Sequence, residues 1–473
     1  MTADDTTLNA SAPWLEVDAL IDDPRTRIVV CCGSGGVGKT TTAAALGVRA
    51  AERGRKAVVL TIDPARRLAQ SMGISELDNV PRQVKGVDDA AGGELHAMML
   101  DMKRTFDEIV EGHADAERAR AILENPFYQS LSAGFAGTQE YMAMEKLGQL
   151  RARDEWDLII VDTPPSRSAL DFLDAPKRLG SFLDGKFIRV LMAPAKVGGR
   201  AGMKFLNVGM SMMTGTLSKL MGGQLLRDVQ MFVAAMDTMF GGFRTRADAT
   251  YRLLQAPGTA FLVVAAPERD ALREAAYFVE RLAAEQMPLA GLVLNRVHGS
   301  GASQLSAERA LAAAETLTEH AAEEAETAAE ERAAAQESEA GTRPDPAPSP
   351  AAGPVAEAAE NLERNGIMDH DGGKNGSRTV GGLSPAAPAA HPAPPTASAA
   401  QLATGLLRLH AERMQVLARE RRTRDRFTAL HPEVPVTEVA ALPGDVHDLT
   451  GLRAIGARLA LDPADGDMAP PQP

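Results

Sequence analysis

The sequence has few residues that could cross-link the chain and no long apolar segment that could insert into a membrane. Only two of its 473 residues are cysteine, and they are adjacent, at Cys31 and Cys32. Adjacent cysteines provide neither a disulfide framework nor spaced metal ligands, and such usage is typical of the reducing cytosol. The first residues lack a basic and apolar leader, and no run of about 20 apolar residues occurs. We therefore expect a cytoplasmic protein without a secretion signal or a membrane span.

The sequence is also short of positive charge. Its 50 Lys and Arg residues face 63 Asp and Glu residues, which gives a net charge of −13. A nucleic-acid-binding protein usually shows a basic balance, so we expect no nucleic-acid partner. One basic run, at 419–426, is better explained as the charged end of a helix than as a nucleic-acid patch.

Short apolar runs of strand length alternate with helix-type segments through much of the chain. They predict strands at 28–32, 56–62, 156–161, 261–266 and 289–294, and an Ala-rich helix at 39–53. Continuous apolar strands between helices indicate an α/β fold, a doubly wound and mostly parallel sheet with helices on both faces. A last strand at 434–439 contains Pro435, which favours the edge of a sheet. Helices at 402–426 and 449–459 complete the predicted fold.

Composition predicts one α/β domain that a long insert interrupts. The core spans 26–300 and is completed by 401–460, while 1–25 and 461–473 are flexible tails. The insert, 301–400, begins with an Ala/Glu-rich stretch at 307–336 that fits a solvated helix, and continues in Pro, Ala, Gly and Ser. So few large apolar residues cannot offset the entropy of ordering, and we expect the insert to be mostly disordered.

A phosphate-binding motif follows the first predicted strand and opens the first helix. The run Gly33-Ser34-Gly35-Gly36-Val37-Gly38-Lys39-Thr40 fits G-x-x-x-x-G-K-[ST] in the strand–turn–helix context that this P-loop motif requires. The backbone N–H groups of the turn and the helix N-terminus would hold the phosphates of a nucleotide. We expect Lys39 on the β- and γ-phosphates, the Thr40 hydroxyl on Mg²⁺, and Thr41 near the α-phosphate.

Two carboxylates follow predicted strands. Asp162 ends the run 158–161 at the place of a Walker B aspartate, which holds Mg²⁺; a helix N-cap is compatible with the same position. Asp63 follows the strand that ends at Ile62 and could orient or deprotonate the attacking water, although Asp-Pro also commonly opens a turn. We predict that Lys39 and Asp63 are catalytic, and that Thr40 and Asp162 hold the metal.

Together these segments resemble the ArsA / Get-pathway ATPase family, a branch of the dimeric P-loop proteins. The family's switch I, T-D-P-A, is similar to Thr61-Ile62-Asp63-Pro64-Ala65, and its switch II is similar to 162–173. The resemblance implies that MgATP is bound and hydrolysed by a dimer, coupled to a client protein, a membrane or an anion-transport partner. It also implies adenine contacts from Asn295 and from Pro443. ATP rather than GTP is expected from the resemblance, since no Asn-Lys-x-Asp motif follows Leu294.

Ser34 departs from the family pattern. The family has a lysine there that reaches across the dimer to the partner's nucleotide. We therefore expect either a slow homodimer or a heterodimer, in which an ArsA-like paralogue supplies the lysine and this chain is weakly active or regulatory. Compensation by Arg66, Arg67 or Arg167 is the alternative. The cysteine ligands of arsenite-pump subunits and the Cys-x-x-Cys zinc clasp of the targeting ATPases are missing, so a pump subunit lacks a recognisable ligand site.

A Met-rich segment at about 185–245 follows the switch II region. Nine of the chain's 20 methionines lie between Met192 and Met239, with glycines among them. Targeting ATPases of the family hold apolar client helices in a helical subdomain at this place, and Met adapts to many apolar shapes. The segment is therefore predicted to be a helical subdomain that contacts an apolar client or the membrane periphery. A Met-containing core or a dimer seam is the alternative.

Overall fold

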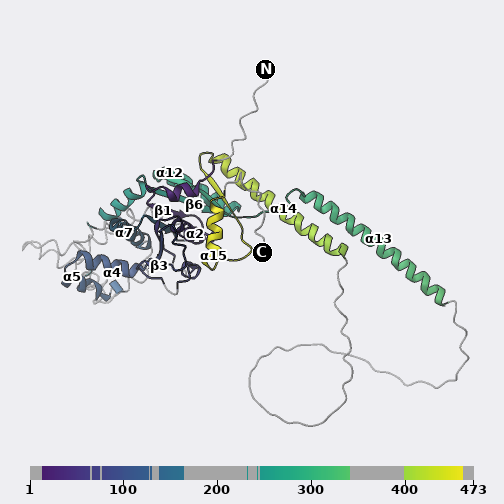
Figure 1. The fold of residues 1–473 in the computed structure, drawn as a ribbon, viewed down its shortest axis with the longest axis horizontal. Helices are drawn as coiled ribbons and strands as arrows, with labels where there is room; N and C mark the ends of the chain where they lie inside the picture. The colour runs from purple at the N-terminus through teal and green to yellow at the C-terminus, as the bar shows by residue number, and fades with distance from the viewer. Residues whose placement is uncertain are drawn as a thin grey trace, which may run out of the picture. The chain divides into compact units, whose positions relative to one another are not determined.

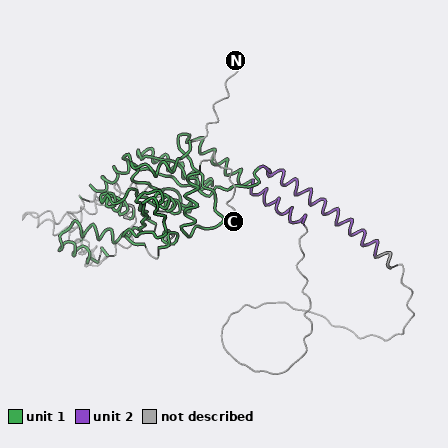
Figure 2. Tube along the Cα trace, viewed as in Figure 1, with its two compact units in different colours: residues 1–303, 415–473 green, residues 304–414 purple. Residues whose placement is uncertain are grey.

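The computed structural model describes residues 13–63, 67–74, 77–126, 128–129, 138–164, 232, 242, 245–340 and 399–461. The Met-rich segment lies almost wholly outside these residues, as do Arg66, Arg167 and the Pro-rich part of the insert. The chain divides into two compact units, 1–303 with 415–473 and 304–414 (Figure 2).

The first unit is built on an eight-stranded sheet (Figure 1). Its strands are β1 (Ile28–Cys32), β2 (Lys56–Thr61), β3 (Arg82–Gln83), β4 (Glu94–Met99), β5 (Leu158–Asp162), β6 (Thr259–Ala265), β7 (Leu289–Val297) and β8 (Val436–Ala440). The spatial order is β3-β4-β2-β5-β1-β6-β7-β8, and every pairing is parallel except β3 with β4. The predicted α/β fold with a mostly parallel sheet is confirmed.

Helices cover both faces of this sheet. They are α1 (Val17–Asp22), α2 (Lys39–Glu52), α3 (Arg67–Ser71), α4 (Met102–His113), α5 (Ala116–Leu123), α7 (Thr138–Arg153), α12 (Arg269–Ala284) and α15 (Leu449–Leu459). Because side chains alternate along a strand, Val30 of β1 enters the core that α4, α7 and α12 close. Val29 enters the opposite core, which contains α2 and α15. Both cysteines are buried in β1.

Two strands, β4 and β8, differ from the sequence-based prediction in different ways. β4, which was not expected, pairs with β2 along its whole length, although Glu94 and His96 interrupt its apolar pattern. Pro435 lies immediately before β8 rather than inside it, and its carbonyl accepts a hydrogen bond from the Leu292 amide at 2.7 Å. Within the described residues β8 is an outer strand of the sheet, as the proline indicated.

The second unit contains two long helical segments. α13 (Ala307–Ala340) covers the expected Ala/Glu-rich helix and runs slightly beyond it. α14 (Ala399–Leu430) begins in this unit and ends in the first one. His410 Nε2 lies 2.8 Å from the Leu305 carbonyl, which joins the two segments. No helix among the described residues is both long enough and apolar enough to cross a membrane.

Candidate nucleotide and metal site

The P-loop joins the end of β1 to the start of α2. Gly33 and Gly38 have φ of +150° and +96°, values that L side chains rarely adopt. A Cβ at Gly33 would lie 2.1 Å from the Val264 carbonyl oxygen, and one at Gly38 would lie 2.2 Å from Asn295 Nδ2. Glycine is therefore required at both positions, because the loop is pressed against β6 and β7. The N-terminus of α2 meets this loop, where its unpaired N–H groups suit an anion.

Lys39 is the first residue of α2 and is buried. Its ammonium donates a hydrogen bond to the Ser34 carbonyl at 2.8 Å, across the mouth of the loop. Burial lowers the pKa of Lys39, while the Asp162 carboxylate and, more weakly, that of Asp63 act in the opposite direction. Burial thus disfavours the charged form of Lys39, and an anion that entered the loop would favour that form again.

Asp162 is the last residue of β5 and is fully buried. Its Oδ2 accepts hydrogen bonds from the hydroxyls of Thr40 at 2.8 Å and Thr61 at 2.9 Å. Its Oδ1 is buried as well and finds no hydrogen-bond partner among the described residues. Burial raises the pKa of Asp162 to about 6, although both hydroxyls favour the charged carboxylate. Asp162 of β5, Thr40 of α2 and Thr61 of β2 therefore lie together.

The site suits Mg²⁺ in its donor chemistry. A hard cation takes carboxylate and hydroxyl oxygens, and Mg²⁺ commonly uses one or two protein ligands beside phosphate oxygens and water. The unpaired Asp162 Oδ1 beside the Thr40 hydroxyl provides such a pair of ligands. No cluster of three or more His, Cys, Asp or Glu side chains suited to a metal exists in the described part of the chain, so phosphate and water would complete the coordination.

Asp63 lies just beyond the end of β2 and is half-buried. Its backbone N–H donates to Thr61 Oγ1 at 3.2 Å. The carbonyl of the same peptide, that of Ile62, accepts from Gln139 Nε2 at 2.8 Å, and the Ile62 amide of the preceding peptide donates to the Asp162 carbonyl at 3.0 Å. Sequence reasoning gave no role to Thr61 or Gln139. A threonine as the last strand residue before the aspartate was the only local signal.

The residues expected at the base lie in different surroundings. Asn295, near the end of β7, is buried and donates from Nδ2 to the Val37 carbonyl at 2.8 Å. It therefore contacts the P-loop directly, and its contact with adenine stays a prediction. Pro443 is exposed on the loop after β8, while the preceding Leu442 packs against the core on the α2 side. Thr41 is half-buried in the first turn of α2.

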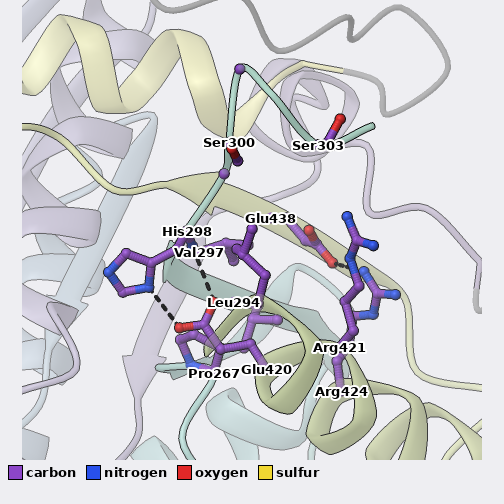
Figure 3. Close-up of a pocket in the computed structure, with 13 residues that line it drawn as sticks. Pro267, Leu294, Val297, His298, Ser300, Ser303, Glu420, Arg421, Arg424 and Glu438 are labelled. Atoms are coloured by element: carbon purple, nitrogen blue, oxygen red, sulfur yellow. Dashed lines mark hydrogen bonds and ion pairs between the residues drawn. The ribbon is translucent and has the colours of Figure 1, made fainter. Parts of the chain in front are cut away.

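A separate cavity of about 340 Å³ lies between the ends of β7 and β8 and the C-terminal half of α14. Figure 3 shows two pairs of polar side chains in it: His298 Nδ1 lies 2.6 Å from Glu420, and Arg424 lies 2.7 Å from Glu438. None of the predicted site residues lines it. These two contacts form a joint between α14 and the sheet, since Glu420 and Arg424 lie on α14, Glu438 lies on β8 and His298 follows β7.

The glycines of the P-loop pack against the neighbouring strands, and a buried carboxylate lies beside its threonine. These features define a P-loop nucleotide hydrolase. The sequence comparison is more specific. Residues 26–319, more than half of the chain, match the family described as anion-transporting ATPase. The chain belongs to this family, and it is a nucleotide-binding ATPase.

Curated relatives agree with this assignment. An ATPase GET3 of Podospora anserina is 26% identical over 315 residues, which are 65% of this chain and 84% of the relative. An ATPase GET3 of Malassezia globosa is 28% identical over 171 residues, 36% of this chain and 48% of the relative. A putative arsenical pump-driving ATPase of Halobacterium salinarum is 30% identical over 193 residues, 38% of this chain and 28% of the relative. Some matches thus span less than half of the relative's length.

Proposed function

We propose that the chain binds MgATP at Gly33–Thr40 and hydrolyses it to drive a conformational switch in a dimer. The observation that carries this proposal is the Asp162 carboxylate. One of its oxygens accepts hydrogen bonds from the P-loop and from the end of β2, and the other has no hydrogen-bond partner among the described residues. A buried carboxylate costs free energy unless something compensates it. Thr40 and Asp162 would hold Mg²⁺, which neutralises charge on the phosphate oxygens.

The remaining roles follow from position. Lys39 would exchange the Ser34 carbonyl for the β- and γ-phosphate oxygens and stabilise their charge. Asp63 would orient the attacking water and accept its proton as the bond from γ-phosphorus to the β–γ bridging oxygen breaks. The products are ADP and inorganic phosphate. Asn295 and Pro443 would approach the adenine from the ends of β7 and β8.

The Asp63→Asn variant tests these roles. We expect MgATP affinity within a few-fold of the wild type and turnover lowered by about 100-fold or more, because a general base contributes on this scale. Lys39→Ala should weaken MgATP binding itself. Asp89→Asn, an exposed carboxylate away from the site, is the control and should change neither quantity. Wild-type turnover that survives Asp63→Asn would remove Asp63 from the mechanism, and a failure to bind MgATP would overturn the proposal.

We further infer that the switch acts on a client protein, a membrane or an anion-transport partner. The anion-transport partner is supported by the name of one relative, a putative arsenical pump-driving ATPase. We propose that this protein is cytoplasmic and that its Met-rich segment, 185–245, contacts an apolar client or the surface of a membrane. Protection of this segment from proteolysis by an apolar peptide or by lipid vesicles, only with ATP present, would support the assignment. Equal cleavage under all conditions would contradict it.

Ser34 supports a second candidate, a weakly active or regulatory subunit of a heterodimer. Its side chain cannot deliver positive charge to a partner's nucleotide, and losing one cationic group can lower phosphoryl transfer by orders of magnitude. Turnover of the purified chain is therefore expected to be slow, and to rise when a paralogue with lysine at the matching position is added. Under this candidate Asp63→Asn in this chain should leave most of the turnover of the complex, whereas in the first candidate it should abolish that turnover. A fully active homodimer would exclude this candidate.

A further inference from the structure

We propose that Thr61 is a positioning residue that ties the backbone of Asp63 to the carboxylate of Asp162 through a single hydroxyl. The proposal deepens the proposed function and rests on it for the roles of the two aspartates.

The directions of the hydrogen bonds follow from the groups involved. Thr61 Oγ1 lies 2.9 Å from Asp162 Oδ2, 3.2 Å from the Asp63 amide nitrogen and 3.5 Å from the Asp63 carbonyl oxygen. An ionised carboxylate only accepts, so the one hydroxyl proton goes to Asp162, the nearer and charged acceptor. The lone pairs of the hydroxyl remain for the N–H of Asp63. Thr61 is therefore donor to one aspartate and acceptor from the other.

The surroundings leave the hydroxyl little freedom. Thr61 is 1% exposed and pairs in register with Asp162 across β2 and β5. As a β-branched residue it has few χ1 rotamers in a strand. β2 ends at Thr61, and the amide of the next residue, Ile62, still donates to the Asp162 carbonyl. The Thr61 hydroxyl accepts from the amide of Asp63, one residue further on, and so extends the order of the sheet by one peptide.

Gln139 supports the same peptide from the helical side. Its Nε2 donates to the Ile62 carbonyl at 2.8 Å, so the Ile62–Asp63 peptide is bound through its carbonyl by α7 and through its N–H by Thr61. A peptide held at both ends can rotate only if one of these bonds breaks. The side chain of Asp63 is thereby aimed by groups that do not touch the reacting atoms.

The test compares Thr61→Val with Thr61→Ser in the full-length protein. Valine keeps the shape and loses the hydroxyl, whereas serine keeps the hydroxyl. We expect Thr61→Val to speed hydrogen exchange of the Asp63 amide about tenfold and to lower kcat about tenfold or more, with the Kd for MgATP changed less than threefold. Thr61→Ser should recover most of both quantities. Exchange is followed by mass spectrometry with residue-level fragmentation.

Thr437→Val is the matched control. Thr437 is also a fully buried strand threonine, and its hydroxyl donates to the Leu459 carbonyl at 3.1 Å, away from the site. Its replacement should leave kcat and Asp63 exchange at wild-type values, even if it lowers stability equally. Should Thr61→Val not fold, Thr61→Ala provides a second variant without the hydroxyl.

Wild-type exchange and wild-type kcat in Thr61→Val would overturn the proposal, and so would a serine variant as impaired as the valine variant. These outcomes are separable from a failure of the proposed function. A wild type that does not turn over MgATP would overturn that function. Faster Asp63 exchange in Thr61→Val would then still support the tie between the two aspartates, and unchanged exchange would overturn it.

Discussion

Asn295 Nδ2 donates a hydrogen bond to the Val37 carbonyl at 2.8 Å, so the end of β7 holds the P-loop from two strands away. The other end of the same amide, Oδ1, accepts from the Arg296 amide at 3.0 Å, where the backbone has a φ of +62°. Both ends of the side chain are used, so the amide is fixed in one orientation. A nucleotide base that required Asn295 would have to share this group with the loop beneath its own phosphates.

The first prediction concerns this contact. Asn295→Ala leaves the buried Val37 carbonyl without its donor, at a cost of about 1–3 kcal/mol. We expect faster amide exchange across 34–38 and a Kd for ATP raised about tenfold. Asn295→Asp is isosteric but cannot donate, and it should bind ATP at least as poorly. Wild-type ATP affinity in Asn295→Asp would show that the contact does not shape the loop.

The second prediction follows from the glycines. Gly38→Ala combines a left-handed φ with a Cβ only 2.2 Å from Asn295 Nδ2, whereas Gly36→Ala has a φ of +76° and open space around the added Cβ. Gly36→Ala should cost about 1–2 kcal/mol from backbone strain alone, and Gly38→Ala clearly more. The double variant Gly38→Ala/Asn295→Ala should recover part of the difference. Urea unfolding of the wild type, Gly38→Ala, Asn295→Ala and the double variant measures the coupling between the two positions. Strictly additive losses of unfolding free energy would rule out the clash.

How far the sequence predicted this site depends on distance along the chain. The P-loop, Asp63 and Asp162 are each marked by a local pattern, an apolar strand followed by a specific polar residue, and so they could be named in advance. The Thr61 hydroxyl gains its role only because β2 and β5 pair in register, about 100 residues apart in sequence. The contact of Asn295 with Val37 spans 258 residues. β4 was not predicted because Glu94 and His96 break the apolar run by which buried strands are recognised.

The third prediction is a pH dependence. The pKa of Asp162 is raised from 3.8 to about 6 in the nucleotide-free fold, so the native state binds this proton more tightly than the unfolded chain does. Asp162 therefore does not weaken the fold below about pH 4, and it costs progressively more stability as the pH rises through 6. The difference of about two pKa units corresponds to about 3 kcal/mol at pH 7.5.

Comparison with Asp162→Asn isolates this effect. The free energy of unfolding of the variant, relative to the wild type, should improve by about 2 kcal/mol between pH 4.5 and pH 7.5 when nucleotide and Mg²⁺ are absent. The variant should also fail to hydrolyse ATP at either pH. A difference that does not change with pH would show that Asp162 titrates normally.

The last prediction concerns the joint between α14 and the sheet. Arg424 bonds to Glu438 at 2.7 Å in a partly buried setting, and Glu420 bonds to both the ring and the backbone amide of His298. Arg424→Met leaves the partly buried Glu438 without its cation, so we expect a loss of about 1–2 kcal/mol. Arg421→Met removes an equal charge from an exposed side chain in the same cavity and should change stability by less than about 0.5 kcal/mol. Equal effects of the two substitutions would show that net charge, rather than the bond to β8, accounts for the loss.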